Sequence, residues 1–337
     1  MTNPDQPPSP DRLTERLEEG ARAEAVTLLD RLDAADVDVR ACTLRAVRSL
    51  VEDRPGVADG LAVPLSEFLT DDDRAVRLTT AKLFVTLARS EAGVVLPVVD
   101  SLADRLADDE EFYYVRARCA EALGYVALEH PKAVSDPEIL ADFRIGLSFD
   151  KPEVKEKLAK GLEFVALADP KRLRHQVSRL AEHLDDENEL VRYHLTTALV
   201  AVGCAFPERG DDASDALVER LSDEDAHVRG RAAEALGVFA RGDVDATLLP
   251  EAILRELVDD EEAFVRDRAR FALDSSRRDA PPDTIPNTIG SIDGVRDTTA
   301  EAVEAITAPD GDGNCPHCGA VLPENGPPVC PRCGVPR

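Results

Sequence analysis

The sequence predicts an all-α fold, an α-α superhelix built of about seven two-helix repeats. A Val-Arg dipeptide, once replaced by Val-Lys, recurs at intervals of 37, 39, 39, 37, 37 and 37 residues. A fixed period of this length indicates supersecondary units that stack on one another. Aromatic residues make up 4% of the chain and Trp is missing, so the core is expected to be aliphatic, as in closely packed helices. The dipeptides are Val39-Arg40, Val76-Arg77, Val115-Arg116, Val154-Lys155, Val191-Arg192, Val228-Arg229 and Val265-Arg266.

The N-terminal residues are predicted to lie outside the repeats. Residues 1–10 contain four prolines and few apolar side chains, which favours disorder. Asp11 is expected to cap a short helix that ends near Glu19 and covers the open end of the first repeat. The repeats are assigned to residues 11–275. The chain shows neither the pattern of a signal peptide nor an apolar run long enough to span a membrane, so a cytoplasmic protein is predicted.

Each repeat is expected to contain a first helix, a short acidic turn and a second helix. We number the second helix from the cation of the dipeptide as position 0. Position −1 is always Val, position +3 is small or aliphatic, and position +7 is apolar. Steps of four place these three positions on one helix face, which is therefore predicted to be buried. Carboxylates in the preceding turn can cap the second helix and complement its dipole.

The segment Leu248–Leu273, LLPEAILRELVDDEEAFVRDRARFAL, resembles a HEAT repeat, with Pro in the first helix, Asp in the turn and Val-Arg in the second. The resemblance extends over residues 21–275. The repeats are also similar to the short HEAT-like repeats of phycobilin-lyase-type proteins. It implies a ladder of contacts between adjacent repeats, formed by the turn Asp and the second-helix Arg. In the fourth repeat Lys155 replaces Arg and Asp150 is one residue out of register. The resemblance therefore does not decide whether the ladder continues there. The implied ladder residues are Asp71, Arg77, Asp186, Arg192, Asp223, Arg229, Asp260 and Arg266.

The charge of the chain indicates a saline environment. The formal net charge is −27, and the 40 cationic residues comprise 33 Arg and 7 Lys. A surface rich in carboxylates and poor in Lys predicts a halophilic protein, because high salt screens the repulsion between like charges. On this ground the chain resembles haloarchaeal proteins. Such a surface repels nucleic acids and anionic membranes on average.

Positions +2 and +5 of the second helices carry many cationic residues, in contrast to the negative net charge of the chain. They lie off the buried face and on the same side of each helix, so stacked repeats would align them into a row that we name the basic stripe. We predict that the stripe binds a partner, either an acidic protein segment or a phosphate backbone. The alternative is that its cations pair with carboxylates of neighbouring turns. The residues of the stripe are Arg118, Lys157, His194, Arg231, Arg268, Arg45, Lys82 and Lys160.

The C-terminal segment CPHCGAVLPENGPPVCPRCG carries the strongest chemical signal. Its two C-x2-C pairs, Cys315 with Cys318 and Cys330 with Cys333, can surround one Zn²⁺ tetrahedrally and leave no ligand position open, as in structural sites. Residues 314–337 resemble the small zinc ribbons at the C-termini of many prokaryotic proteins. Disulfides or a redox-active pair are the alternatives. Residues 276–313, rich in Pro, Gly, Asp and Thr, are predicted to form a flexible linker with a short helix from Thr298 to Ile306.

No catalytic constellation stands out, because the six histidines are dispersed and neither a phosphate-binding Gly loop nor a nucleophile motif occurs. We therefore predict a scaffold or adaptor without enzymatic activity, which binds an unidentified protein through the repeats and uses the zinc ribbon as an auxiliary contact. No membrane partner is expected. One alternative is a nucleic-acid- or chromosome-associated HEAT factor that uses the basic stripe. Another is an enzyme similar to bilin lyases.

Overall fold

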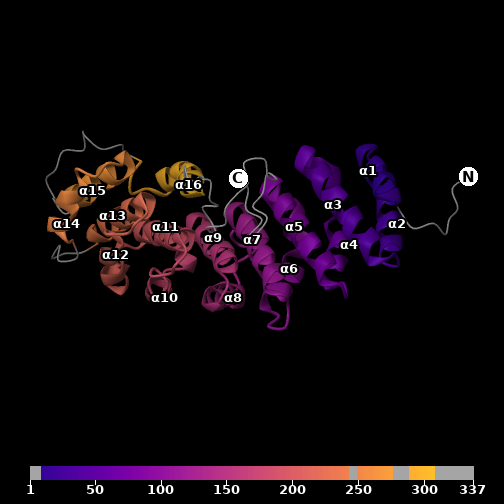
Figure 1. The fold of residues 1–337 in the computed structure, drawn as a ribbon, viewed down its shortest axis with the longest axis horizontal. Coiled ribbons are helices and arrows are strands. Elements are labelled where there is room, and N and C mark those ends of the chain that lie inside the picture. Colours follow the sequence, from indigo (N-terminus) through magenta and orange to yellow (C-terminus); the bar gives the residue numbers. More distant parts are fainter. Residues whose placement is uncertain (1–8, 243–248, 276–287, 308–337) are drawn as a thin grey trace, which may run out of the picture. The chain divides into compact units, whose positions relative to one another are not determined.

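The computed structural model describes residues 9–242, 249–275 and 288–307. Every regular element in these ranges is a helix, which confirms the predicted all-helical repeat fold (Figure 1). The chain forms two compact units. The first comprises Met1–Asp150 and Lys157–Ala168, and the second comprises Lys151–Glu156 and Asp169–Arg337. Helix α9 therefore contributes residues to both units.

The first helices of the repeats are short, and a turn of 3₁₀-helix precedes or follows several of them. Prolines account for part of this, because Pro starts a helix readily but cannot continue one. Their bounds are α2 Arg22–Leu32, α4 Ala62–Ser66, α6 Val99–Ala107, α8 Pro137–Ile145, α10 Val177–Ala181, α12 Ser214–Arg220 and α14 Glu251–Leu257.

The second helices are longer and form the main packing elements of both units. Within the first unit α3 packs on α5 and α5 on α7, and within the second α11 packs on α13 and α13 on α15. Asp73 and Asp225 cap α5 and α13 by accepting backbone N–H groups of the first turn, as the acidic turns predict, whereas the cap of α11 is the amide of Asn188. The bounds are α3 Val37–Asp53, α5 Arg74–Ser90, α7 Tyr113–Glu129, α9 Pro152–Ala168, α11 Glu189–Ala205, α13 Ala226–Ala240 and α15 Ala263–Ser275.

The predicted buried face of the second helices is confirmed. In the five central repeats positions −1, +3 and +7 are almost completely buried, as in the set Val228, Ala232 and Leu236. The two exceptions, Val39 and Leu273, are half-buried and belong to the first and the last repeat. Small residues bring neighbouring helices close together. A Cβ atom on Gly237 would stand 2.6 Å from the ring of Phe271, closer than van der Waals contact allows, so this position requires glycine.

Ion pairs join most of the turns to the preceding second helix. Arg192 contacts Asp223 at 2.7 Å and Arg229 contacts Asp260 at 3.0 Å. Arg192 also donates to the carbonyls of Asp186 and Glu187 at the base of its own helix, and each turn Asp accepts the N–H two residues on. One side chain thus shapes its turn and binds its neighbour. The other pairs of this kind are Arg40 with Asp71, Arg77 with Glu111, and Lys155 with Asp186.

The ladder changes its chemistry at the fourth repeat. Phe149 stands six residues before Lys155, in the place that Asp holds elsewhere, and the Arg116 guanidinium lies 4.7 Å from the centre of its ring. A cation–π contact replaces the ion pair there. Lys155 nevertheless pairs with Asp186 of the next repeat. Arg266, in the last repeat, donates to the carbonyls of Asp260 and Glu261.

Both ends of the repeat array differ in detail from the prediction. Helix α1, Pro10–Glu18, packs on α3 and buries Leu13 and Leu17. Its N-cap is Ser9 and not Asp11, because Pro10 takes the first helical position and the Ser9 hydroxyl accepts the N–H of Arg12. Ser9 and Pro10 thus belong to an ordered element, and residues 1–8 lie outside the described residues.

The second difference concerns the predicted linker. Helix α16, Ile292–Thr307, is longer than expected and packs on α11 of the second unit (Figure 1). The prediction of a flexible linker is therefore wrong for residues 288–307, because their small and apolar side chains find a surface to pack on. Residues 276–287 and 308–313 lie outside the described residues.

None of the helices in the described ranges is both long enough and apolar enough to cross a membrane.

We predict that removing one carboxylate of the ladder destabilises the second unit. Asp223→Ala removes the carboxylate that binds Nε and Nη2 of Arg192 and that accepts the Asp225 N–H, which should lower the free energy of unfolding by about 3 kcal/mol. Chemical denaturation measures this change. Asp267→Ala is the matched control, since Asp267 pairs with Arg270 on the open surface and should cost less than about 1 kcal/mol. Equal losses for both variants would contradict the structural role of the ladder.

Candidate partner-binding surface

The basic stripe has two halves that differ in environment. In the first unit Arg45 is exposed, and Lys82, Arg118, Lys157 and Lys160 are half-buried. We name these five residues the basic face. In the second unit His194, Arg231 and Arg268 are buried, with 2%, 0% and 5% of their surface exposed. The stripe is therefore not a continuous open surface.

Glu121 binds two cations of the basic face, one on α7 and one on α9. Its carboxylate accepts a hydrogen bond of 2.6 Å from Arg118 and one of 3.2 Å from Lys160, whose ammonium group also contacts the Tyr125 hydroxyl at 3.0 Å. Burial by itself raises the pKa of Glu121, but Lys157, Lys160 and Arg118 outweigh burial and hold this pKa at about 2. Glu121 is thus ionised at every pH at which the protein is expected to work.

Lys82 of α5 has a different environment. Burial lowers its pKa, and the positive charges of Arg118 and Arg48 lower it further. Arg48 itself lies 3.5 Å from Glu52, one turn further along α3. No carboxylate of the described residues pairs with Lys82. This part of the basic face therefore carries more positive than negative charge.

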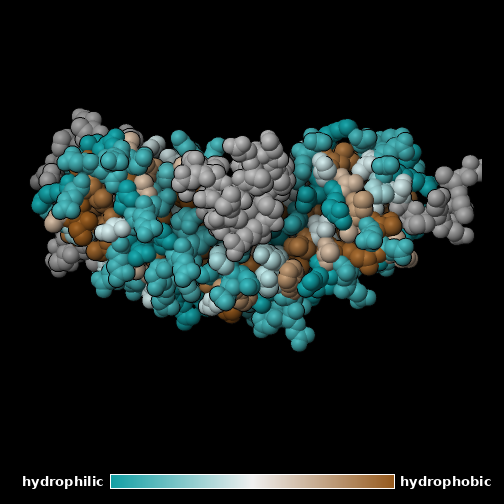
Figure 2. All heavy atoms as spheres, viewed as in Figure 1, coloured by the Kyte–Doolittle hydropathy of each residue, from teal (hydrophilic) through white to brown (hydrophobic). Residues whose placement is uncertain are grey.

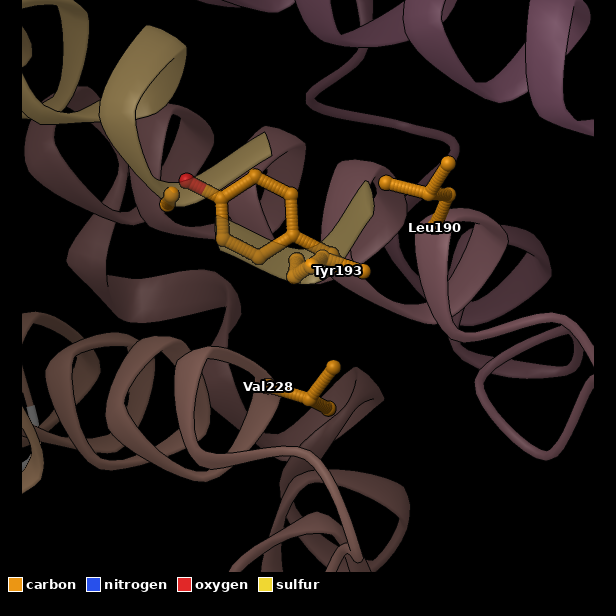
Figure 3. Packing of buried hydrophobic residues seen from close by; sticks show 5 residues of the cluster. Leu190, Tyr193 and Val228 are labelled. Carbon is orange, nitrogen blue, oxygen red and sulfur yellow. The ribbon is translucent and has the colours of Figure 1, made fainter. Parts of the chain in front are cut away.

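In the second unit helix α16 covers the stripe. Its buried residues Gly294, Val295, Ala302 and Ile306 face the second helices. Ala302 and Ile306 join a cluster with Leu190, Tyr193 and Val228, and Figure 3 shows the Tyr193 ring beside the ribbon of α16. A helix of the chain itself thus covers the part of the stripe that was predicted to bind a partner.

Arg231 is the polar centre of this contact. Its guanidinium donates to Glu234 at 2.7 Å on the same helix, and to the Thr298 hydroxyl at 2.8 Å and the Val295 carbonyl at 3.2 Å on α16. It also contacts the Tyr193 hydroxyl at 3.2 Å. The prediction that Arg231 is an exposed partner-binding residue is wrong, because the chain itself supplies its partners.

Glu234 completes the network from the opposite side. It accepts from Arg268 at 2.8 Å and from the N–H of Gly290 at 2.9 Å. Burial by itself raises its pKa, but Arg231, Arg268 and the Gly290 N–H outweigh burial and hold the pKa lowered. One buried carboxylate thus lies between two buried guanidinium groups. Breaking such a network by removing one member leaves an uncompensated buried charge, which is costly.

Sequence reasoning missed Glu234, Tyr193 and α16 as parts of this surface. A signal for α16 was present, since its apolar and small residues follow steps of three and four from Val295 to Ile306, which is the spacing of one helix face. From this segment the sequence predicts a short helix from Thr298 to Ile306, but not that it packs on the second helices. On the face that Figure 2 shows, most of the surface of the second unit is hydrophilic.

The predicted zinc ligands Cys315, Cys318, Cys330 and Cys333 lie outside the described residues. Inside those residues, no group of three or more His, Cys, Asp or Glu side chains could hold a metal ion. Of the remaining cysteines Cys119 is buried, Cys204 half-buried and Cys42 exposed.

Comparison with known proteins identifies the fold. Residues 177–274 match the sequence pattern of HEAT repeats. The crystal structure of an engineered protein is similar with a TM-score of 0.66 and 22% identity, over 79% of this chain and 72% of that one. A designed armadillo repeat protein in complex with the peptide (KR)4 is similar with a TM-score of 0.56 and 19% identity, over 65% of this chain and 100% of that one. The chain thus has an armadillo-like repeat fold with HEAT repeats.

A second engineered protein is similar with a TM-score of 0.57 and 25% identity, over 65% of this chain and 99% of that one. None of the curated proteins compared with the chain matches it.

We predict that Glu121 makes stability depend on acid pH. Its folded pKa of about 2 lies below its ordinary value of 4.5. The stabilisation is therefore fully present above pH 4.5 and is lost as the pH falls toward 2, on the order of 3 kcal/mol in total. Unfolding free energies of the wild type and Glu121→Gln should differ at pH 7, and this difference should shrink as the pH falls from 4.5 toward 2. The control is Glu129→Gln, on the exposed end of the same helix, which should change the free energy of unfolding at pH 7 much less than Glu121→Gln does. A difference for Glu121→Gln that does not shrink in acid would contradict this assignment.

Proposed function

We propose that this chain is a scaffold or adaptor without enzymatic activity, which binds protein segments along the surface of its second helices. The observation that carries the proposal is α16. Positions +2 and +5 of α13 bind it through Arg231 and Glu234, with hydrogen bonds to a hydroxyl, a carbonyl and the nearby Gly290 N–H. This surface is therefore suited in shape and chemistry to a helical segment. An armadillo-like repeat fold fits such a role, since extended repeat surfaces serve as binding surfaces.

The zinc ribbon would act as an auxiliary contact. We propose that Cys315, Cys318, Cys330 and Cys333 hold one structural Zn²⁺, because four thiolates in two C-x2-C pairs match its tetrahedral coordination. Seven residues, 308–314, separate the end of α16 from Cys315. Even fully extended they span about 30 Å. The ribbon would therefore stay near the second unit and present its contact there.

Binding of nucleic acid receives less support from the structure than from the sequence. Arg231 and Arg268 are buried and hydrogen-bonded to Glu234, so neither can reach a phosphate while α16 is in place. Five cations of the stripe remain on the basic face, in a chain of net charge −27. Halophilic origin, cytoplasmic location and the absence of enzymatic activity stay predictions of the sequence.

Affinity capture from cell extract at high salt tests the scaffold function. The baits are the full chain, residues 1–307, and the Cys315→Ser/Cys330→Ser variant. The truncation follows Thr307 because a shorter chain would lose α16 and uncover Arg231. We expect the three baits to recover the same protein, with crosslinks that map to the second helices. Crosslinks confined to the ribbon, or recovery of nucleic acid alone, would overturn the proposal.

The zinc site gives an independent prediction. The purified full chain should contain about one equivalent of zinc, measured by elemental analysis after dialysis against a weak chelator. The Cys315→Ser/Cys330→Ser variant should contain almost none, since two thiolates bind too weakly. The control is Cys42→Ser, which changes an exposed cysteine in the repeats and should retain the metal. A full chain without zinc, with Cys315 and Cys330 in disulfides, would show that the cysteines have another role.

A further inference from the structure

Equivalent positions of the second helices have different surroundings in the two units. In the second unit position +2 of α13 is Arg231 and position +5 is Glu234, and α16 buries both completely. In the first unit position +5 is Arg45 on α3, which is exposed, and Lys82 on α5, which is half-buried. The same helix face thus holds a helix in one unit and stays accessible in the other.

The charge at position +5 determines whether a segment bound to the second helices must supply carboxylates. Position +5 is a carboxylate on α13 and on α7, where Glu234 and Glu121 neutralise adjacent cations. On α3 and α5 the same position is a cation, Arg45 or Lys82. Burial lowers the pKa of Lys82 and the positive charges of Arg118 and Arg48 lower it further, and no described carboxylate pairs with it. A segment that lies across α3 and α5 must therefore bring the neutralising carboxylates itself.

We propose that the basic face, Arg45, Lys82, Arg118, Lys157 and Lys160, binds an acidic amphipathic helix of a partner protein. This inference rests on the scaffold function proposed above. The partner helix lies across α3, α5 and α7 as α16 lies on α11, with small residues toward the repeats. Its carboxylates reach Lys82 and Arg45, because the carboxylate of Glu121 is already bound by Arg118 and Lys160.

The geometry of α16 supports a helix as the occupant. Its inner side consists of small and hydroxyl residues such as Gly294, Thr298 and Ala302, which let the two backbones approach. The carbonyl of Val295 lies within hydrogen-bonding distance of Arg231. A nucleic acid duplex offers no such narrow inner side. Because it is wide, it would also meet the acidic turns beside the second helices, where like charges repel it.

Binding of labelled peptides to the full chain, followed by fluorescence anisotropy, tests the proposal. The probe has the sequence of α16 with Thr298→Glu and Thr299→Glu, which puts carboxylates on the inner side. A matched peptide carries Lys at both positions. We expect the acidic probe to bind at least about tenfold more tightly than the basic one, and its affinity to fall as salt rises. Equal affinity of the two peptides would overturn the proposal.

Variants of the protein locate the binding site. Arg45→Glu/Lys82→Glu should weaken binding of the acidic probe at least about tenfold, and Lys82→Met, which keeps an unbranched side chain, should weaken it less. The matched control is Arg255→Glu/Arg270→Glu, the same change of charge on exposed residues of the second unit, which should leave the affinity within about twofold. Thermal unfolding of each variant shows that it is folded, and a loss in the control as large as in the double variant would overturn the proposal.

Two further outcomes separate this inference from the scaffold function. If Arg45→Glu/Lys82→Glu binds the acidic probe as the wild type does, while affinity capture still recovers a protein crosslinked to the second helices, the scaffold stands and the basic face is not its site. If a DNA duplex of about 20 base pairs binds more tightly than the acidic probe and Arg45→Glu/Lys82→Glu abolishes that binding, the basic face recognises phosphate and the inference fails.

Discussion

The Asp–Arg contact between successive repeats is the interaction on which the rest of the structure depends. Asp223 accepts the N–H of Asp225 at the start of α13 and also binds Arg192 of the preceding second helix. A single carboxylate thus sets the turn inside one repeat and the register toward the next. Because second helices held in this register align their equivalent positions, +2 and +5 form one surface from repeat to repeat within each unit. The placement of α16 and of the basic face follows from that alignment.

Much of the fold was predictable because the period and the buried positions are properties of single helices. The spacing of Val228, Ala232 and Leu236 identifies a buried face without any knowledge of neighbouring elements. The ladder could be inferred only by resemblance, since it joins residues 31 positions apart such as Arg192 and Asp223. Its replacement by a cation–π contact at Phe149 depends on a pair that periodicity does not reveal.

The candidate site was harder to predict for a physical reason. Helical periodicity places Arg231 off the core of its own repeat, and this is correct, but it cannot show that a segment more than 60 positions later covers it. A row of cations at positions +2 and +5 is compatible with an open surface and with a buried network. Which one forms depends on the nearest carboxylate and on any covering helix. Glu234 and α16 supply both in the second unit, and among residues 9–242, 249–275 and 288–307 neither occurs at Lys82.

The docking of α16 also has a consequence for the order of folding. Arg231 and the Val295 carbonyl that it binds are 64 residues apart in the chain, so this contact closes a long loop and forms late compared with contacts inside a repeat. During synthesis the repeats up to Ser275 leave the ribosome before α16 does. At that stage the hydrogen bonds of Arg231 to Val295 and Thr298 have not formed, and the second unit is incomplete. The chain therefore completes its second unit only when residues well beyond the last repeat have been made.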